Sequence, residues 1–297
     1  MSKLVVVTGA TGNVGKELAE GLLAHGVRVR AVGRSAERLA SLVEKGAEAA
    51  VGSVEDGAFL ARAFQGADAV FAMIPPNYGT PDMRAYQKVV VAAFASSLRE
   101  SGVPRVVTLS SVGADQPGGN GPVAGLYDLE RAIAGIAGLH AVHVRAGFFM
   151  ENHLQNLGLI KTAGINGSPL KADLPIAMIA TKDIAAFALG FLADPTFTGR
   201  TAREAYASRN YTMAEATAIL GAAIVKPALP YVEFSYEDAR KAMVQAGVTA
   251  DMASLYVEMY QALNDGRMTT LEPRSPANST PTSLEDFATV FAAAYGS

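Results

Sequence analysis

Short apolar runs and amphipathic stretches alternate through the first half of the chain. The apolar runs are too short for helices and are rich in valine and alanine, which favours buried strands. These runs lie at residues 4–7, 27–32, 47–51, 69–74, 105–109 and 139–144. Stretches with apolar residues at helical spacing separate them, at 16–23, 36–44, 56–64, 83–100 and 126–137. Strands that alternate with helices in this way predict a doubly wound parallel sheet with right-handed crossovers.

The pattern changes character near residue 150. Helices are predicted at 149–162, 182–192, 250–265 and 284–295, and strands at 176–180 and 204–207. Capping signals open further helices at Thr212 and Ser235, and Ser283 caps the last one. The segment 269–282 is rich in Pro, Ser and Thr and predicts an exposed loop. We therefore expect a sheet domain at 1–150 and a smaller α+β lobe at 151–297 that covers the substrate, with some of its strands rejoining the main sheet.

Composition restricts the classes of function that the chain can have. Half of the 297 residues are apolar and 18% are charged, which is enough for a sizeable core. The net charge of −3 gives no electrostatic attraction to nucleic acid or to an anionic membrane. Cysteine is absent, which excludes disulfides, thiolate chemistry and cysteine-based metal sites. No apolar stretch approaches the ~20 residues that span a bilayer, and residues 1–3 lead into a strand rather than a secretory signal. We expect a cytoplasmic protein with no nucleic-acid or membrane partner; whether it forms a homo-oligomer is left open.

Residues 8–15 read Thr-Gly-Ala-Thr-Gly-Asn-Val-Gly, between the first strand and the first helix. Gly9 allows a sharp turn out of the strand, Gly12 lets the backbone approach a pyrophosphate, and Gly15 lets the helix lie close to the sheet. Free N–H groups and the positive end of the helix dipole then face the phosphates. Strand, glycine turn and helix in this order predict a Rossmann-type dinucleotide site. We assign to it the turn residues Gly9, Thr11, Gly12, Asn13, Val14 and Gly15.

The second strand carries the signal for cofactor choice. A carboxylate at its end would bond the ribose 2′-hydroxyl of NAD, but the chain has Gly33-Arg34-Ser35 there. Arg34 offers a planar fork of donors suited to a 2′-phosphate, Ser35 can donate another bond, and Arg38 adds charge nearby. A solvated arginine beside an ordinary helix cap is the alternative. We predict NADP(H) as the cofactor, bound at this end by Arg34 and Ser35.

Two later strand ends should face the same cleft. Ile74, Pro75, Pro76 and Tyr78 end or follow the fourth strand, at the point of the sheet where ligands bind in doubly wound folds. Residues after the sixth strand would reach the nicotinamide side, where apolar rings and one amide suit a flat aromatic substrate. These are Phe148, Phe149, Met150 and Asn152. The alternative for the phenylalanines is core packing.

Six segments together resemble a known family: residues 8–15, 33–35, 109–114, 145–152, 182–185 and 280–287. The chain is similar in these segments, and in their order, to the NmrA-like branch of atypical short-chain dehydrogenases. The resemblance implies NADP(H) bound on a Rossmann domain, with a smaller C-terminal lobe over the nicotinamide end. Members include NADPH-dependent quinone, azo-dye and triphenylmethane-dye reductases. Others bind the dinucleotide without known turnover and act as redox-responsive regulators.

The catalytic signature of short-chain dehydrogenases is Tyr-x-x-x-Lys with a serine upstream. Tyr127 lies where the tyrosine is expected, Arg131 stands in place of the lysine, and Ser110 is the upstream serine, which would also contact the cofactor. Lysine lowers the tyrosine pKa, and tyrosine passes a proton to the substrate oxygen. Arginine keeps the charge but not the compact ammonium. Tyr127 is therefore either a general acid or a wall of the pocket.

These features favour an NADPH-dependent reductase of a small, planar, electron-poor substrate, such as a quinone, dye or enone. Tyr78, Phe148, Phe149 and Asn152 are the predicted substrate contacts. A redox-sensing regulator without turnover and a ketoreductase or isomerase of specialised metabolism are the alternatives, the latter requiring a competent Tyr127. No metal site is predicted, since His140 and His143 lie at odd spacing in one strand and point to opposite faces.

Overall fold

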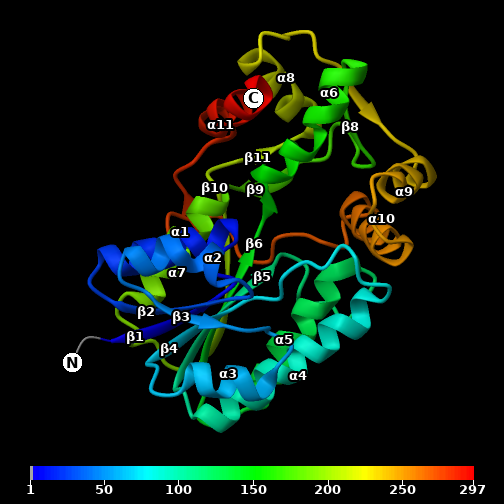
Figure 1. The fold of residues 1–297 in the computed structure, drawn as a ribbon. Coiled ribbons are helices and arrows are strands. Elements are labelled where there is room, and N and C mark those ends of the chain that lie inside the picture. Colours follow the sequence, from blue (N-terminus) through cyan, green and yellow to red (C-terminus); the bar gives the residue numbers. More distant parts are fainter. Residues whose placement is uncertain (1–2) are drawn as a thin grey trace.

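Eight parallel strands form the main sheet of the computed structural model, which describes residues 3–297 (Figure 1). Their spatial order is β13-β10-β6-β5-β4-β1-β2-β3. The strands are β1 (Leu4–Thr8), β2 (Arg28–Gly33), β3 (Glu48–Val51), β4 (Ala69–Ala72), β5 (Arg105–Ser111), β6 (His140–Ala146), β10 (Arg200–Ala207) and β13 (Ser279–Thr280). The predicted Rossmann-type doubly wound sheet is confirmed. The expectation about the start of the chain rests partly on Met1 and Ser2, which lie outside the described residues.

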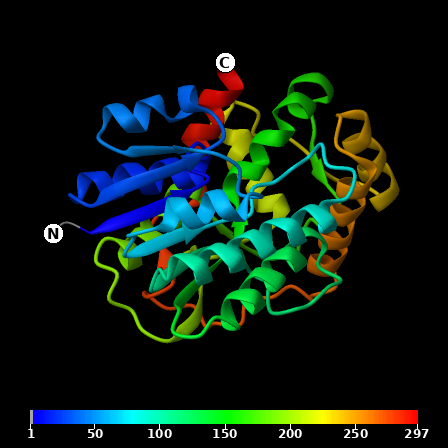
Figure 2. The same ribbon diagram turned by 60° about the horizontal axis from the view of Figure 1, so that its bottom comes forward.

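Helices cover both faces of this sheet (Figures 1 and 2). One face carries α1 (Asn13–Ala24), α2 (Ala36–Glu44) and α7 (Thr181–Leu192), and the other carries α3 (Gly57–Phe64), α4 (Met83–Ser101) and α5 (Ala124–Ala134). Successive residues of β1 therefore enter opposite cores: Val5 and Val7 pack toward the first set of helices, and Leu4 and Val6 toward the second. Burial on both faces explains why the central strands β1 and β4 read as unbroken apolar runs.

The C-terminal lobe stands over the carboxyl ends of the strands. Its strands form two small sheets, β11-β9-β7 and β12-β8. These strands are β7 (Phe148–Phe149), β8 (Asn166–Ser168), β9 (Ile176–Ile179), β11 (Asn210–Tyr211) and β12 (Tyr231–Glu233). The helices are the 3₁₀ helix η2 (Met150–Asn156), α6 (Leu157–Ala163), α8 (Met213–Ala223), α9 (Tyr236–Gln245), α10 (Ala250–Asn264) and α11 (Leu284–Gly296). A short 3₁₀ helix in the first half, η1 (Gly121–Val123), precedes α5.

The start of this lobe corrects the helix expected at 149–162. Phe148 and Phe149 instead pair with β9, a 3₁₀ helix follows, and α6 begins only at Leu157. Gly147 allows this, because a Cβ there would overlap the Ala177 carbonyl of β9. The predicted caps are confirmed: Thr212 and Ser283 form capping boxes with Glu215 and Asp286, and Ser235 accepts from the Asp238 amide.

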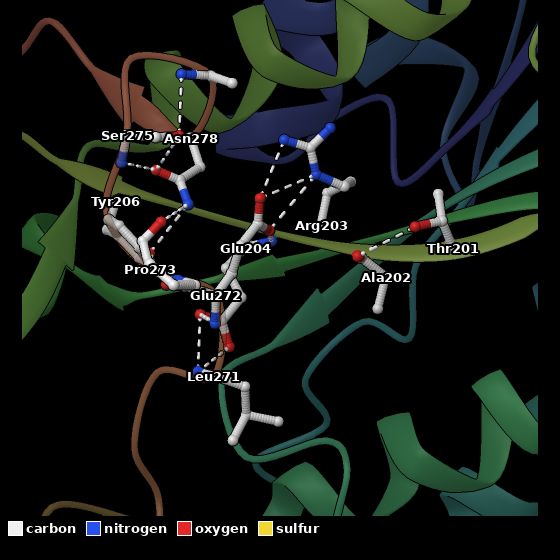
Figure 3. Close-up of polar contacts among 11 residues, drawn as sticks. Thr201, Ala202, Arg203, Glu204, Tyr206, Leu271, Glu272, Pro273, Ser275 and Asn278 are labelled. Atoms are coloured by element: carbon white, nitrogen blue, oxygen red, sulfur yellow. Dashed lines mark hydrogen bonds and ion pairs between the residues drawn. The ribbon is translucent and has the colours of Figure 1, made fainter.

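The segment 269–282 is also different from the expected exposed loop. Its first half is largely exposed, but Asn278, Thr280 and Thr282 are buried, because β13 adds to the edge of the main sheet beside β10. Figure 3 shows the polar contacts that hold it there: the Glu204 carboxylate accepts from the amides of Leu271 and Glu272. Asn278 bridges Tyr206 and the Pro273 carbonyl. Strands β10 and β13 thus bring the second half of the chain into the main sheet.

No helix in residues 3–297 is both long and apolar enough to cross a membrane.

Candidate cofactor and substrate site

In the glycine turn between β1 and α1, Gly9 and Gly15 lie where the fold leaves no room for a side chain. Gly9 has a φ of +66°, and the Gly12 amide donates to its carbonyl at 2.9 Å, which closes the turn. A Cβ on Gly9 would meet the Met73 side chain, and one on Gly15 would overlap the Gly9 carbonyl. Gly9 and Gly15 are therefore required by the fold itself.

Gly12 is different from the other two glycines. Its φ is −95°, and a Cβ there would have only the Gly9 carbonyl oxygen within reach, at 3.4 Å. The fold of the chain tolerates a side chain at this position. Gly12 is also the N-cap of α1, and within residues 3–297 no side chain caps this helix. The amides of its first turn, Asn13 and Val14 among them, are thus available to an anion such as a phosphate.

A cationic cluster lies at the end of β2, next to this turn. Ser35 caps α2, where its hydroxyl oxygen accepts from the Arg38 amide at 3.3 Å and keeps its own hydrogen free to donate. The Arg38 guanidinium reaches across to the Thr11 carbonyl at 3.1 Å. Arg34, between β2 and Ser35, is exposed. These three residues fit a phosphate on the adenosine ribose of a dinucleotide bound at the turn.

A cavity of about 490 Å³ opens at the carboxyl ends of β4, β5 and β6. Most of the predicted contacts line it: Ile74, Tyr78, Ser110, Phe148, Phe149 and Asn152. Pro75 does not line the cavity. Its carbonyl accepts from the Tyr86 hydroxyl at 3.2 Å, and Pro76 lines the cavity instead. The parallel strand ends and the lobe above them thus enclose this cavity, and one of its lining residues, Met73, lies against Gly9 of the glycine turn.

The opposite wall comes from α10, which the sequence reasoning missed. Met252, Tyr256, Met259 and Leu263 of this helix face the cavity. Their spacing of three and four residues was visible in the sequence, but it is also the spacing of an ordinary core-facing stripe. Only the position of the C-terminal lobe shows that this stripe lines a cavity and does not pack in a core.

The walls of this cavity are free of formal charge. In the described part of the chain, no Asp, Glu, Lys or Arg is among the lining residues. Five of the lining residues are methionines, namely Met73, Met83, Met252, Met259 and Met268. The cavity therefore suits an uncharged, largely apolar ligand.

Beneath the cavity wall lies a buried ion pair that holds Ser110. The Ser110 hydroxyl donates to the Glu130 carboxylate at 2.6 Å. Arg145 clamps the same carboxylate through two bonds, of 3.1 and 2.7 Å. The hydrogen bond to Glu130 raises the pKa of Arg145 above its usual value. With its hydrogen directed to Glu130, Ser110 presents oxygen lone pairs to the cavity.

The helix α5 does not turn the predicted pair toward this site. Leu126 lines the cavity and Glu130 bonds Ser110, whereas neither Tyr127 nor Arg131, both within the described residues, lines the cavity, and Arg131 is exposed. One residue along a helix rotates a side chain by about 100°. The residues that occupy the Tyr-x-x-x-Lys spacing on the inner face are thus Leu126 and Glu130. The sequence did carry a signal for Glu130: this acid lies four residues after Leu126 and three before Ile133, on the apolar face of the helix.

The histidines of β6 have structural partners. His143 is buried, with its Nδ1 atom 2.8 Å from the Thr108 hydroxyl, and burial lowers its pKa. His140 accepts from the Gly199 amide at 3.0 Å. Residues 3–297 contain no group of three or more His, Asp or Glu side chains placed to hold a metal ion.

A classical dinucleotide-binding strand order, a glycine turn and a cavity at the carboxyl ends of the strands define a Rossmann-type nucleotide-binding protein. The chain belongs to the NmrA-like family, whose model matches residues 1–288. The predicted resemblance is confirmed.

Two relatives are enzymes by name. The chain is 33% identical over 244 residues to a (4-alkanoyl-5-oxo-2,5-dihydrofuran-3-yl)methyl phosphate reductase of Streptomyces griseus, covering 81% of this chain and 80% of that protein. It is 28% identical over 259 residues to an NAD(P)H azoreductase of Xenophilus azovorans, covering 86% of each.

Solved structures share the fold over nearly the whole chain. Triphenylmethane reductase of Citrobacter sp., complexed with NADP(H), has a TM-score of 0.80 at 20% identity, covering 98% of this chain and 100% of that one. The NADPH-dependent quinone oxidoreductase of Escherichia coli, complexed with NADPH, has a TM-score of 0.80 at 21% identity, covering 97% and 99%.

Proposed function

We propose that this protein is an NADPH-dependent reductase of small, planar, electron-poor and uncharged substrates, such as quinones, neutral dyes or enones. The observation that carries the proposal is the uncapped start of α1 at Gly12, where the fold would accept a side chain, together with a charge-free cavity at the carboxyl ends of the strands. The reductase names of the relatives support the same class of reaction. We also propose that it acts on small molecules in the cytoplasm, without a nucleic-acid partner.

The residues present fit NADP(H). Gly9, Gly12 and the amides of Thr11, Asn13, Val14 and Gly15 would surround the pyrophosphate. Arg34, Ser35 and Arg38 would hold the 2′-phosphate, and Ile74 and Ser110 would flank the nicotinamide end. When bound, the dinucleotide supplies the hydride. The protein contributes binding, orientation and an apolar space that excludes water.

Ser110 is proposed to orient the cofactor or the substrate rather than to transfer a proton. Its hydrogen is held by Glu130, so its oxygen accepts a bond, as from a carboxamide N–H. Arg145 holds the Glu130 carboxylate in place through two hydrogen bonds. The arrangement makes Ser110 a preorganised acceptor on the cavity wall.

The position of Tyr127 favours substrates that need no protein acid. A ketone requires a proton on its oxygen as it is reduced, but a reduced quinone is a stabilised anion that water can protonate. Because Leu126 rather than Tyr127 lines the cavity, we disfavour the ketoreductase alternative, which requires Tyr127 as its acid. A regulator without turnover stays the second candidate, because the position of Tyr127 off the cavity wall also fits a protein that only binds the dinucleotide.

The cavity walls favour a broad specificity for uncharged substrates. Methionine side chains are flexible and polarisable, so they adapt to planar rings of different outline. The substrate named for the S. griseus relative is a phosphate ester. We propose that this chain does not act on such an ester, because the lining residues within 3–297 offer its phosphate no lysine or arginine.

The test is a scan of substrates with the purified protein. NADPH consumption is followed with a naphthoquinone, a neutral azo dye, a cyclic enone and a simple ketone. The proposal expects turnover with the first three classes and little with the ketone. Tight NADPH binding without turnover of any of them would favour the regulator.

A further inference from the structure

A second cavity of about 480 Å³ adjoins the first beneath the C-terminal lobe. The two share the lining residues Tyr78, Phe148, Asn152, Tyr256 and Met259. We call the second cavity the distal chamber and define it by the residues that line it alone, chiefly His153, Leu170, Met213, Met243, Ala246 and Val248. The two cavities are thus neighbours, separated by no more than one layer of flexible side chains, which a long ligand would have to displace to occupy both.

His153 is a buried polar side chain of the distal chamber that lacks a partner. It is 2% exposed, and its Nε2 atom has no hydrogen-bond partner in the described part of the chain. Burial lowers its pKa to about 4, so the imidazole is uncharged at neutral pH. Its ring stands edge-on to that of Phe148, with ring centroids 6.0 Å apart. His153 thus lies one ring beyond the layer that both cavities share.

Two other polar residues of the chamber, Asn156 and Ser168, already have partners. The Asn156 amide donates to Asn166 and to the Gly167 carbonyl, and the Ser168 hydroxyl lies 2.7 Å from that of Tyr231. A buried polar nitrogen without a partner is costly to keep, which points to a ligand that completes it. A neutral imidazole can donate through one nitrogen and accept through the other, so it suits a hydroxyl or a carbonyl group.

The walls limit the ligand further. Within residues 3–297, no Asp, Glu, Lys or Arg lines the distal chamber, and its remaining surface is mainly methionine, tyrosine, leucine and valine side chains. A charged substituent would be desolvated there without a counter-ion. An alkyl chain or a second ring would be favoured by burial of apolar area.

We infer that the distal chamber is a substrate subsite, which binds an uncharged apolar substituent of the substrate whose hydroxyl or carbonyl group bonds His153. The inference rests on the proposed reductase function and narrows its substrates to extended molecules. These carry an electron-poor head that is reduced in the first cavity and a neutral tail in the second.

Three quinones with the same head distinguish binding in the first cavity from binding in the distal chamber. The parent dimethoxymethylbenzoquinone has no tail, decylubiquinone has an apolar tail, and idebenone has that tail with a terminal hydroxyl. KM is measured for each with NADPH, and Kd is measured by calorimetry with NADP⁺ bound. We expect both tailed quinones to bind more tightly than the parent, and idebenone more tightly than decylubiquinone.

Two variants test the chamber itself. His153→Phe keeps a ring against Phe148 but removes both nitrogens, so idebenone should lose its advantage over decylubiquinone, a factor of roughly 2 to 12 for one hydrogen bond between uncharged groups. Ala246→Trp fills the chamber from the exposed end of α9 and should weaken both tailed quinones relative to the parent. Ala242→Trp is the matched control, on an exposed position of α9 outside both sets of lining residues.

The outcomes separate the two proposals. If quinones are reduced but Ala246→Trp and Ala242→Trp bind the tailed quinones equally well, the distal chamber is not a subsite and the reductase function stands. If idebenone keeps its advantage in His153→Phe, the assigned hydrogen bond is wrong. If no quinone is reduced, the reductase function fails, and the calorimetric affinities still decide whether the chamber binds the tail.

Discussion

Gly12→Val distinguishes a glycine kept for a ligand from a glycine kept for the fold. Gly12 has a φ of −95°, and its added Cβ would lie 3.4 Å from the Gly9 carbonyl oxygen, an ordinary contact. The variant should fold. The valine methyl groups would occupy the space in front of the first amides of α1, where we place the pyrophosphate.

The expected loss follows from the contacts that a displaced phosphate gives up. A hydrogen bond to a charged group contributes ~1.5–3 kcal/mol, so losing the bonds to the Asn13 and Val14 amides costs about 3–6 kcal/mol. NADPH affinity should fall roughly 10²- to 10⁴-fold. Losing a favourable N-cap residue should lower stability by no more than about 1 kcal/mol.

Calorimetry with NADPH and thermal unfolding by circular dichroism measure the two effects separately. Gly135→Val is the matched control: Gly135 has a φ of −79°, and its Cβ would lie 3.4 Å from the Ala132 carbonyl, at the end of α5 outside the site. It should bind NADPH like the wild type. A folded Gly12→Val protein with unchanged NADPH affinity would refute the pyrophosphate assignment.

Three further predictions concern cofactor binding by Arg34, the role of Tyr127 as an acid, and the effect of His153 on the pH dependence of stability. Arg34→Ala should weaken NADPH binding roughly 10- to 150-fold and leave NADH nearly unchanged in the same calorimetry, since one charge-assisted bond to the 2′-phosphate is lost; equal losses for both would contradict this role. Tyr127→Phe should lower quinone turnover far less than the ~10²–10⁴-fold of a general acid, and a thousandfold loss would restore the acid role. His153 has a folded pKa of about 4, below its usual 6.5, so the unfolded chain takes up its proton first as the pH falls. The contribution of the uncharged His153 side chain to the free energy of unfolding is fully present above pH 6.5 and is lost as the pH falls toward 4. Between pH 7 and 5, the wild type should therefore lose about 2 kcal/mol more stability in urea unfolding than His153→Phe; equal losses would show that His153 titrates normally.

The fold was predictable because local signals and packing agree. The central strands β1 and β4 are buried on both faces, so each reads as an apolar run, and the glycine turn is determined by close contacts of Gly9 and Gly15. Three of the family segments, 145–152, 182–185 and 280–287, contain residues that bond partners far away in the sequence. Asp183 accepts from the amide and hydroxyl of Thr282 at 2.9 and 2.8 Å, and Glu151 accepts from the amide and hydroxyl of Thr181 at 2.9 and 2.6 Å.

The site was less predictable, because it depends on rotation and on tertiary placement. Tyr127 and Leu126 are neighbours in the sequence, and only the packing of α5 on the sheet decides which of them faces the cavity. The wall formed by α10 has the same apolar spacing as a core helix. The segment 269–282 has loop composition, yet Glu204 and Asn278 hold it against β10.

The most direct test of the proposed function is NADPH consumption by the purified protein with a neutral naphthoquinone and with its sulfonated derivative. The account predicts sustained oxidation of NADPH with the neutral quinone and a much higher KM for the sulfonate, because the cavity offers its charge no partner among the lining residues in 3–297. Tight NADPH binding with no reduction of the neutral quinone, or equal KM values for the two, would contradict it.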